Sequence, residues 1–285
     1  MDISPSGWIR LKKFKKVTYK PSNCNYNFTI CYKDIEALND KETQVPLKIM
    51  SFDIEASSSH GDFPLAKKRY EKLAGDILDY WDVYEECDGD VLRDIILAAF
   101  NFLEDEDNII HEVFPKRRIG KENLKNKIKG LLKSNIVDYL NSDLKRGEKY
   151  EHLCFRPARD KKKAVLGLLP THLPPLQGDK VTFIGSTFRT FGEKEPYFNH
   201  CISLDKCSEV NNVEIESYET EEEVILKWVD LIQKEKPDII VGYNIFGFDW
   251  KFLFARAEEL NCKNEFLCLS KNHNYKCNHT KKTIK

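Results

Sequence analysis

The sequence predicts an α/β fold with a mixed central sheet and one long helical insertion after the first strand. Three observations lead to this prediction. Residues 46–54 form an apolar segment typical of a buried strand, strands alternate with helices again after residue 179, and the region between has helically spaced apolar residues. The 285 residues, 41% of them hydrophobic, suffice for one large domain or two modest ones.

Residues 1–45 are predicted to be part of a β-rich N-terminal domain. Residues 7–11 and 26–32 have the aromatic and β-branched content of strands. A basic stripe lies between them, and either a nucleic-acid contact or a solvated face explains it. Its members are Lys12, Lys13, Lys15, Lys16 and Lys20.

The first strong strand is predicted at residues 46–54. Its nearly continuous apolar sequence is expected of a central strand that is covered on both faces. Asp53 and Glu55 are two positions apart, so their side chains project from one face of an extended chain. The sequence from Ser57 to Gly61 then ends the strand.

The insertion is predicted to span residues 65–178. Apolar spacing indicates helices at 65–84, 90–103 and 121–140, and the prolines of residues 169–175 indicate a loop. The third helix is rich in lysine. A solvated helix face is the favoured explanation, and contact with DNA is the alternative.

Residues 179–260 return to alternating strands and helices. Strands at 180–190 and 197–204 are predicted to form a hairpin around a turn at 192–196, followed by a short strand at 213–218. Thr220, with Glu223 three residues later, forms a capping box that opens a helix. A second buried strand is predicted at residues 238–243, with a helix at 248–260.

From residue 46 the predicted order is strand, insertion, two or three antiparallel strands, helix, strand and helix. This order resembles the plan of a ribonuclease-H-like domain, spanning residues 46–285 here. In that plan the first strand and the strand at 238–243 are parallel neighbours in the sheet centre. Their carboxyl ends then lie together, where open α/β sheets place their sites.

Three carboxylates are therefore expected at one place: Asp53, Glu55 and Asp249. Clustered carboxylates bind hard divalent cations such as Mg²⁺ or Mn²⁺. A pair of such ions can activate a water molecule and stabilise the leaving oxygen in phosphodiester hydrolysis. The residues near Asp249 suit a single-stranded terminus, because the Asn244 amide can hold a phosphate or sugar and the Phe248 ring can stack on a base.

Two of these segments carry a family resemblance. Residues 51–55, SFDIE, resemble the first exonuclease motif of family B DNA polymerases, and residues 242–249, GYNIFGFD, resemble the second. The flanking residues 7–9 and 236–241 agree with this. The likeness is to delta-type polymerases of eukaryotes and large DNA viruses, and residues 62–66 resemble the viral branch.

The resemblance implies a fragment of a replicative DNA-directed DNA polymerase that carries the 3′–5′ proofreading exonuclease. It implies that Asp53, Glu55 and Asp249 are the catalytic residues and bind two Mg²⁺ or Mn²⁺ ions. Asn244, Phe248 and Tyr243 would then hold the single-stranded primer 3′ end. Implied partners are DNA and the remaining polymerase domains or a second chain carrying them, with a sliding clamp as an optional addition.

The sequence departs from the family pattern in two ways. The third exonuclease motif, Tyr-x-x-x-Asp, does not follow residue 249; residues 84–88 and 139–143 have its spacing but lie too early. The polymerase palm motifs, including Tyr-Gly-Asp-Thr-Asp, are not found. We therefore expect a polymerase fragment that has three of four carboxylates and hydrolyses DNA poorly or not at all by itself.

Two alternatives from other classes remain open. One is a stand-alone nuclease of the same fold in which the insertion supplies the fourth acid, for example Asp143. The other is a non-catalytic module that binds a primer terminus or tethers another subunit. Its DNA affinity would not respond to Mg²⁺ or to Asp53→Asn.

The cysteines and the chain ends bear on the compartment. The chain has nine cysteines, an odd number, which predicts free thiols. No leader and no long apolar run is found, so we expect a soluble intracellular protein. Its expected location is the nucleus or a cytoplasmic viral replication site. The net charge of −1 gives no global attraction to nucleic acid. Cys268, His273, Cys277 and His279 match no common zinc-finger spacing, so zinc is not expected.

Overall fold

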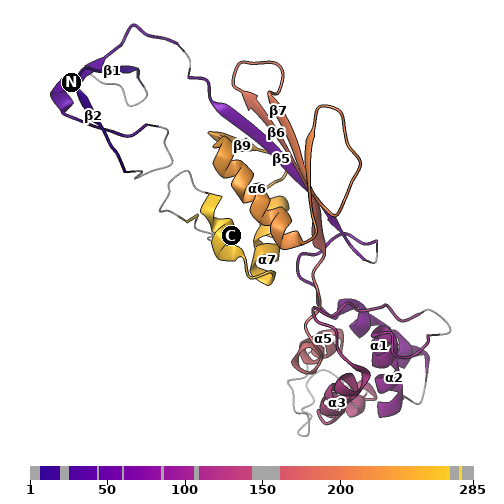
Figure 1. Ribbon diagram of the computed structural model, residues 1–285. Coiled ribbons are helices and arrows are strands. Elements are labelled where there is room, and N and C mark those ends of the chain that lie inside the picture. Colours follow the sequence, from indigo (N-terminus) through magenta and orange to yellow (C-terminus); the bar gives the residue numbers. More distant parts are fainter. Residues whose placement is uncertain are drawn as a thin grey trace. The chain divides into compact units, whose positions relative to one another are not determined.

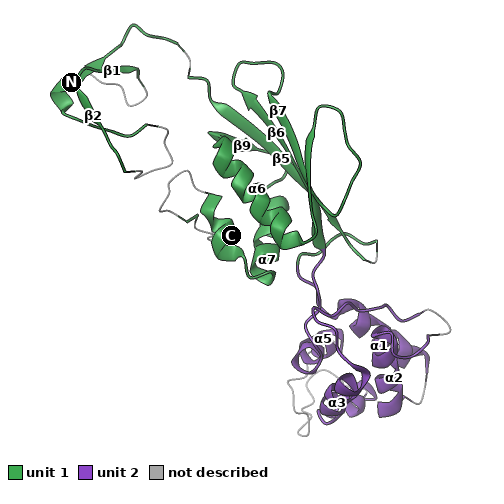
Figure 2. Ribbon diagram, viewed as in Figure 1, with its two compact units in different colours: residues 1–66, 180–285 green, residues 67–179 purple. Residues whose placement is uncertain are grey.

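A computed structural model of the chain separates it into two compact units, residues 1–66 with 180–285 and residues 67–179 (Figure 2). The described residues are 7–19, 26–43, 45–59, 61–84, 87–105, 109–142, 161–269 and 276–277.

The first unit is built on a five-stranded mixed sheet with the order β8-β7-β6-β5-β9 (Figure 1). Strand β6 runs antiparallel to both β5 and β7, whereas β9 is parallel to β5 and β8 is parallel to β7. The strands are β5 (Lys48–Ser57), β6 (Lys180–Thr190), β7 (Phe198–Leu204), β8 (Glu214–Tyr218) and β9 (Ile239–Val241).

The predicted α/β class is confirmed, as are the β6–β7 hairpin and the parallel pairing of the first strand with the strand near residue 239. Two details of the strand directions and order were wrong. Strand β8 is parallel to β7 rather than antiparallel, because the connection at residues 205–213 carries the chain back to the start of β7. Strand β9 is at the edge of the sheet rather than in its centre, and Ile239 and Val241 are 40% and 43% exposed.

One face of this sheet is covered by helices (Figure 1). The buried residues of β5, namely Met50, Phe52 and Ile54, join a core with α6 (Glu221–Glu235) and α7 (Asp249–Glu259). Asp53 and Glu55 alternate with them and are exposed. Strand β5 is therefore fully buried on one face only, contrary to the predicted cover on both, because its two acids belong to the opposite set of alternating positions.

Helix α6 begins as predicted. The Thr220 hydroxyl accepts a hydrogen bond from the Glu223 backbone N–H at 3.3 Å, and the Glu223 carboxylate accepts one from the Thr220 N–H at 3.1 Å. This capping box satisfies two N–H groups that a helix start would otherwise leave unpaired. Two short elements close the unit after α7, namely α8 (Lys263–Phe266) and the 3₁₀ turn Leu267–Leu269.

A buried ion pair fixes α7 against α6. The Arg256 guanidinium donates to both Glu221 carboxylate oxygens, at 2.8 and 2.6 Å, and to the Ala66 carbonyl at 3.1 Å. Glu221 also accepts from the Val181 N–H at the start of β6. Arg256 and Glu221 are 1% and 4% exposed. Glu259 is a second carboxylate 3.1 Å from Arg256, whereas the Glu221 charge depends on Arg256 for its compensation.

The second unit contains five helices among the residues described: α1 (Glu71–Val83), α2 (Gly89–Ala99), α3 (Lys121–Leu132), α4 (Ile136–Leu140) and α5 (Lys161–His172). The helix predicted at 121–140 is interrupted, because Asn135 has the left-handed φ of 60°. Helix α5 was missed: Pro170 lies inside it, where a loop was predicted.

The N-terminal region forms two small antiparallel ladders. Strand β1 (Ile9–Leu11) pairs with β4 (Ile35–Ala37), and β2 (Phe14–Lys16) pairs with β3 (Phe28–Ile30). A 3₁₀ turn, Tyr32–Asp34, precedes β4. Lys12, Lys13, Lys15 and Lys16 are exposed, and Lys20 is outside the described residues.

The described cysteines are free: Cys31, Cys87, Cys201, Cys207, Cys262, Cys268 and Cys277. In the part of the chain that the structure describes, no helix combines the length and the apolar character needed to cross a membrane. His273 and His279, from the pattern weighed for zinc, are outside the described residues.

Replacing Arg256 by methionine should destabilise the first unit by about 3–5 kcal/mol, because Glu221 is left buried without its cation. Urea unfolding followed by tryptophan fluorescence measures this. Lys251→Met, at an exposed position of the same helix, is the matched control and should change the unfolding free energy by less than about 0.5 kcal/mol. Equal stability of Arg256→Met and wild type would contradict this account of the pair.

Candidate active site

The carboxylate of Asp249 lies against strand β5. It accepts a hydrogen bond from the backbone N–H of Ile54 at 3.2 Å, and Ile54 is the residue between Asp53 and Glu55. The parallel pairing of Met50 with Ile240 and of Ser51 with Val241 brings the start of α7 to this point. Asp249 is only 2% exposed. Residues separated by almost two hundred positions thus meet at one strand end.

Asp53 and Asp249 interact directly through their side chains. Burial raises the pKa of Asp249, and both the hydrogen bond and the negative charge of Asp53 raise it further, whereas the N–H groups of Asp249 and Ile54 act in the opposite direction. Two neighbouring carboxylates repel each other when both are ionised. A divalent cation would relieve this repulsion, so this pair suits one.

Glu55 is on the same side of β5 as Asp53 and is exposed. The three predicted carboxylates do not gather as closely as expected. Among the described residues, one group of three has its ligand atoms within 4.8 Å of one another, and that group is His200, Glu214 and Glu216. Asp249 interacts with Asp53, and Glu55 is an exposed carboxylate on the same side of β5 as Asp53.

A tight loop connects β9 to α7. The Asn244 carbonyl accepts from the N–H groups of Gly247 at 2.8 Å and Phe248 at 3.0 Å, and Asn244 itself has the left-handed φ of 52°. This turn leaves Asn244 exposed and Tyr243 94% exposed, next to the buried Asp249. Polar and aromatic side chains are thus presented to solvent beside the carboxylates.

Phe248 lies against a residue that the sequence reasoning did not select. The Phe63 ring packs edge-on against it, with ring centroids 5.4 Å apart, and Phe63 is 73% exposed. Phe63 follows the end of β5, so only the tertiary fold brings it to this loop. In the sequence, Phe63 stood out only as part of residues 62–66, whose resemblance to the viral branch assigned it no role in the site.

Residues 1–72 and 127–283 match the family described as DNA polymerase family B, exonuclease domain. The chain belongs to this family. The resemblance drawn from the two motifs at residues 51–55 and 242–249 is thereby confirmed.

The curated relatives are viral and eukaryotic polymerases. The DNA polymerases of Phaeocystis pouchetii virus and Pyramimonas orientalis virus are both 32% identical over 97% and 99% of this chain. The DNA polymerase delta catalytic subunit of Arabidopsis thaliana is 40% identical over 31% of it. The chain spans 32%, 25% and 8% of the length of these relatives, respectively.

The remaining predicted residues have different outcomes. Asp88, from one of the early Tyr-x-x-x-Asp patterns, caps α2: its carboxylate accepts from the N–H groups of Asp90 at 2.9 Å and Val91 at 3.0 Å. Asp88 therefore has a capping role, which agrees with the match of residues 84–88 to the Tyr-x-x-x-Asp spacing being a coincidence. Asp143, the fourth acid of the stand-alone nuclease alternative, is outside the described residues.

Asp249→Asn should raise Tm at pH 7 without divalent cations. An asparagine oxygen can still accept from Ile54, and the repulsion with Asp53 is removed. Because folding raises the pKa of Asp249 above its ordinary 3.8, its ionised form is destabilising above the folded pKa. The difference in Tm between Asp249→Asn and wild type should therefore narrow as the pH falls through the folded-state pKa of Asp249.

Calorimetry from pH 7 downward in a chelating buffer measures this difference. Glu193→Gln, which removes one exposed carboxylate from the β6–β7 turn, is the control and should show no such trend. A lower Tm for Asp249→Asn at neutral pH would contradict the account of the pair.

Gly242→Ala should destabilise the site loop. An added Cβ would lie 2.2 Å from Ile245 Cγ2 and 2.9 Å from the Phe52 carbonyl oxygen, and the latter is backbone that cannot move aside easily. We expect a loss of about 1–3 kcal/mol in the free energy of unfolding. Gly185→Ala on β6, where an added Cβ meets nothing within 4 Å, is the control. A fully stable Gly242→Ala variant would show that the loop is looser than described.

Proposed function

We propose that this chain is the 3′–5′ proofreading exonuclease region of a replicative family B DNA polymerase. The observation that carries the proposal is the Asp249 carboxylate bonded to the Ile54 N–H, directly between Asp53 and Glu55. The family membership of the chain and the DNA polymerase names of its relatives support it. Strand synthesis, which the relatives' names describe, belongs to their longer chains.

The proposed metal ligands are Asp53, Glu55 and Asp249. Two Mg²⁺ or Mn²⁺ ions held there would activate water and stabilise the leaving oxygen of the 3′-terminal phosphodiester. Asp249 is rigid, since it is buried and anchored to the backbone of β5. Glu55 is exposed and can swing toward the pair. The site thus combines one fixed ligand with one adjustable ligand.

The loop beside the carboxylates is proposed to receive the primer 3′ end. Phe248 and Phe63 form an edge-on pair whose exposed ring faces suit base stacking, which contributes about 1–3 kcal/mol per base. Asn244 and Tyr243 are exposed and can donate hydrogen bonds to phosphate or sugar. A single strand fits this arrangement because only unpaired bases can stack on side chains.

A test uses the chain with a fluorescent single-stranded oligonucleotide that has a free 3′ hydroxyl. Mg²⁺ or Mn²⁺ should strengthen binding. Any 3′-directed hydrolysis should fall by about 100-fold or more in Asp53→Asn, because a direct ligand is lost. Anisotropy reports the affinity, and gel analysis of shortened products reports the rate. Glu193→Gln makes the same charge change away from the site and should behave like wild type.

The outcomes separate the alternatives. DNA affinity that does not respond to divalent cations or to Asp53→Asn would overturn the proposal in favour of a non-catalytic binding module. Full nuclease activity of the chain alone that is lost in Asp143→Ala would favour the stand-alone nuclease. A cation-dependent affinity that Asp53→Asn removes, with slow or no hydrolysis, is the result expected of an exonuclease region that has three of its four carboxylates.

A further inference from the structure

A second polar cluster occurs on strands β7 and β8. His200 on β7 is directly opposite Glu214 on the parallel strand β8, and Glu216 is two residues further along β8. Alternation along each strand places all three side chains on one face of the sheet. Their ligand atoms lie within 4.8 Å of one another. Three residues with metal-binding groups thus converge on one point.

The histidine of this cluster is buried and incompletely satisfied. The side chain of His200 is 2% exposed. Its Nε2 is 3.2 Å from a Glu216 carboxylate oxygen, while its Nδ1 is buried and has no hydrogen-bond partner among the described residues. Buried polar atoms are nearly always paired in proteins, so an unpaired one needs an explanation. A cation bound to Nδ1 would be such a partner.

Charged groups surround the cluster on the side of α6. His200, Glu214 and Glu216 line a pocket together with Lys227, Asp230 and Lys234. Lys227 is engaged by Asp230 at 3.3 Å. Both Glu216 carboxylate oxygens face polar groups, one the Tyr218 hydroxyl and the other His200 Nε2. The three carboxylates of the pocket, those of Glu214, Glu216 and Asp230, outnumber its two lysines.

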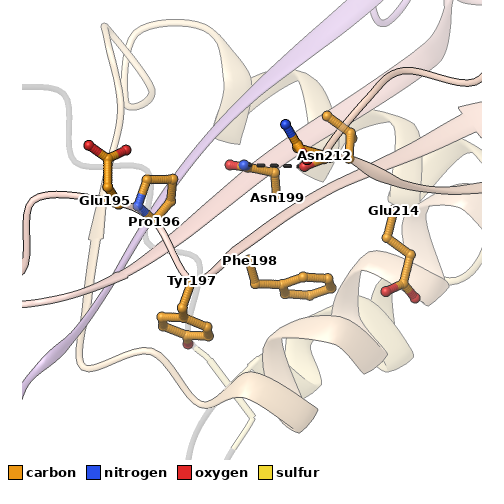
Figure 3. Close-up of a pocket in the computed structure, with 8 residues that line it drawn as sticks. Glu195, Pro196, Tyr197, Phe198, Asn199, Asn212 and Glu214 are labelled. Carbon is orange, nitrogen blue, oxygen red and sulfur yellow. Dashed lines mark hydrogen bonds between the residues drawn. The ribbon is translucent and has the colours of Figure 1, made fainter.

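Figure 3 shows Glu214 in the neighbouring pocket at the β6–β7 turn. Glu214 and Phe198 project to the same side of their strands, while Asn199 points to the other side, where its amide donates to the Asn212 carbonyl at 3.4 Å. Phe198 and Glu214 also line the neighbouring pocket at the β6–β7 turn. The approach to Glu214 is therefore open, whereas His200 forms the buried end of the cluster.

We propose that His200, Glu214 and Glu216 bind one divalent transition-metal ion that fastens edge strand β8 to β7. One imidazole nitrogen and two carboxylate oxygens are a ligand set that suits Mn²⁺ or Zn²⁺, with water completing the coordination. The geometry needs little rearrangement, because the ligands already sit on two hydrogen-bonded strands. The ion would add a cross-link to a strand that has a sheet neighbour on one side only.

This site is separate from the carboxylates on β5. Asp53 is paired with Gly185, and Gly185 is paired with Cys201, so Cys201 is in line with Asp53 across the sheet. His200 is one residue from Cys201 and therefore faces the opposite side of the sheet. The two sites share no ligand, so the proposal does not depend on exonuclease activity.

The test uses the full chain with Asp53→Asn and Asp249→Asn, which removes the ligands on β5. Mn²⁺ is the probe, because thiolates of the free cysteines compete for Zn²⁺ more strongly. Electron paramagnetic resonance counts the bound Mn²⁺, and calorimetry follows Tm. We expect one bound ion and a Tm rise of about 3 °C when free Mn²⁺ is about ten times its Kd.

Glu214→Gln in the same background should abolish both the bound ion and the Tm rise. Glu214 is exposed, so this change should not disturb folding. Glu209→Gln, an exposed carboxylate in the β7–β8 connection, is the matched control and should keep both effects. No bound Mn²⁺ in the background variant, or binding that persists in Glu214→Gln, would overturn the proposed site.

Discussion

The hydrogen bond from the Ile54 N–H to the Asp249 carboxylate is the contact on which the candidate active site depends. It exists because β9 runs parallel to β5 and stops three residues short of Ile54. At the other end of this pairing, Asp238 and Lys48 exchange two hydrogen bonds of 2.8 Å. The register of β9 on β5 is therefore fixed before the loop begins. This register places Asp249, the first residue of α7, next to Ile54.

This arrangement keeps a carboxylate where it is energetically unfavourable. Asp249 is buried, adjoins Asp53 and has a raised pKa. Burying its ionised carboxylate costs free energy, which other contacts of the fold must offset. The Arg256–Glu221 pair supplies such contacts by tying α7 to α6 and to the start of β6. A site that is destabilising without cations and restrained by its neighbours is ready for a positively charged ligand.

Local chemistry made some elements predictable from the sequence. The apolar run of β5, the capping box at Thr220 and the Asp-x-Glu and Asn-x-x-x-Phe-Asp patterns each depend on residues close together in the chain. The direction of β8, the edge position of β9 and the contact of Phe63 with Phe248 depend on long-range pairing, which no local pattern encodes. The cluster of His200, Glu214 and Glu216 was not predicted, because it too depends on the pairing of two strands.

Side chains along β5 point alternately to its two faces, which explains how one strand contributes both to the core and to the candidate site. Phe52 and Ile54 are buried against the helices, so Asp53 and Glu55 must face the other way. A slip of one residue would exchange the two sets and bury both acids, which makes the register strongly specified. The same pairing sets Ser57 opposite Lys180. The chain therefore leaves and rejoins the sheet on adjacent strands, and residues 67–179 can be inserted without breaking the pairing that forms the site.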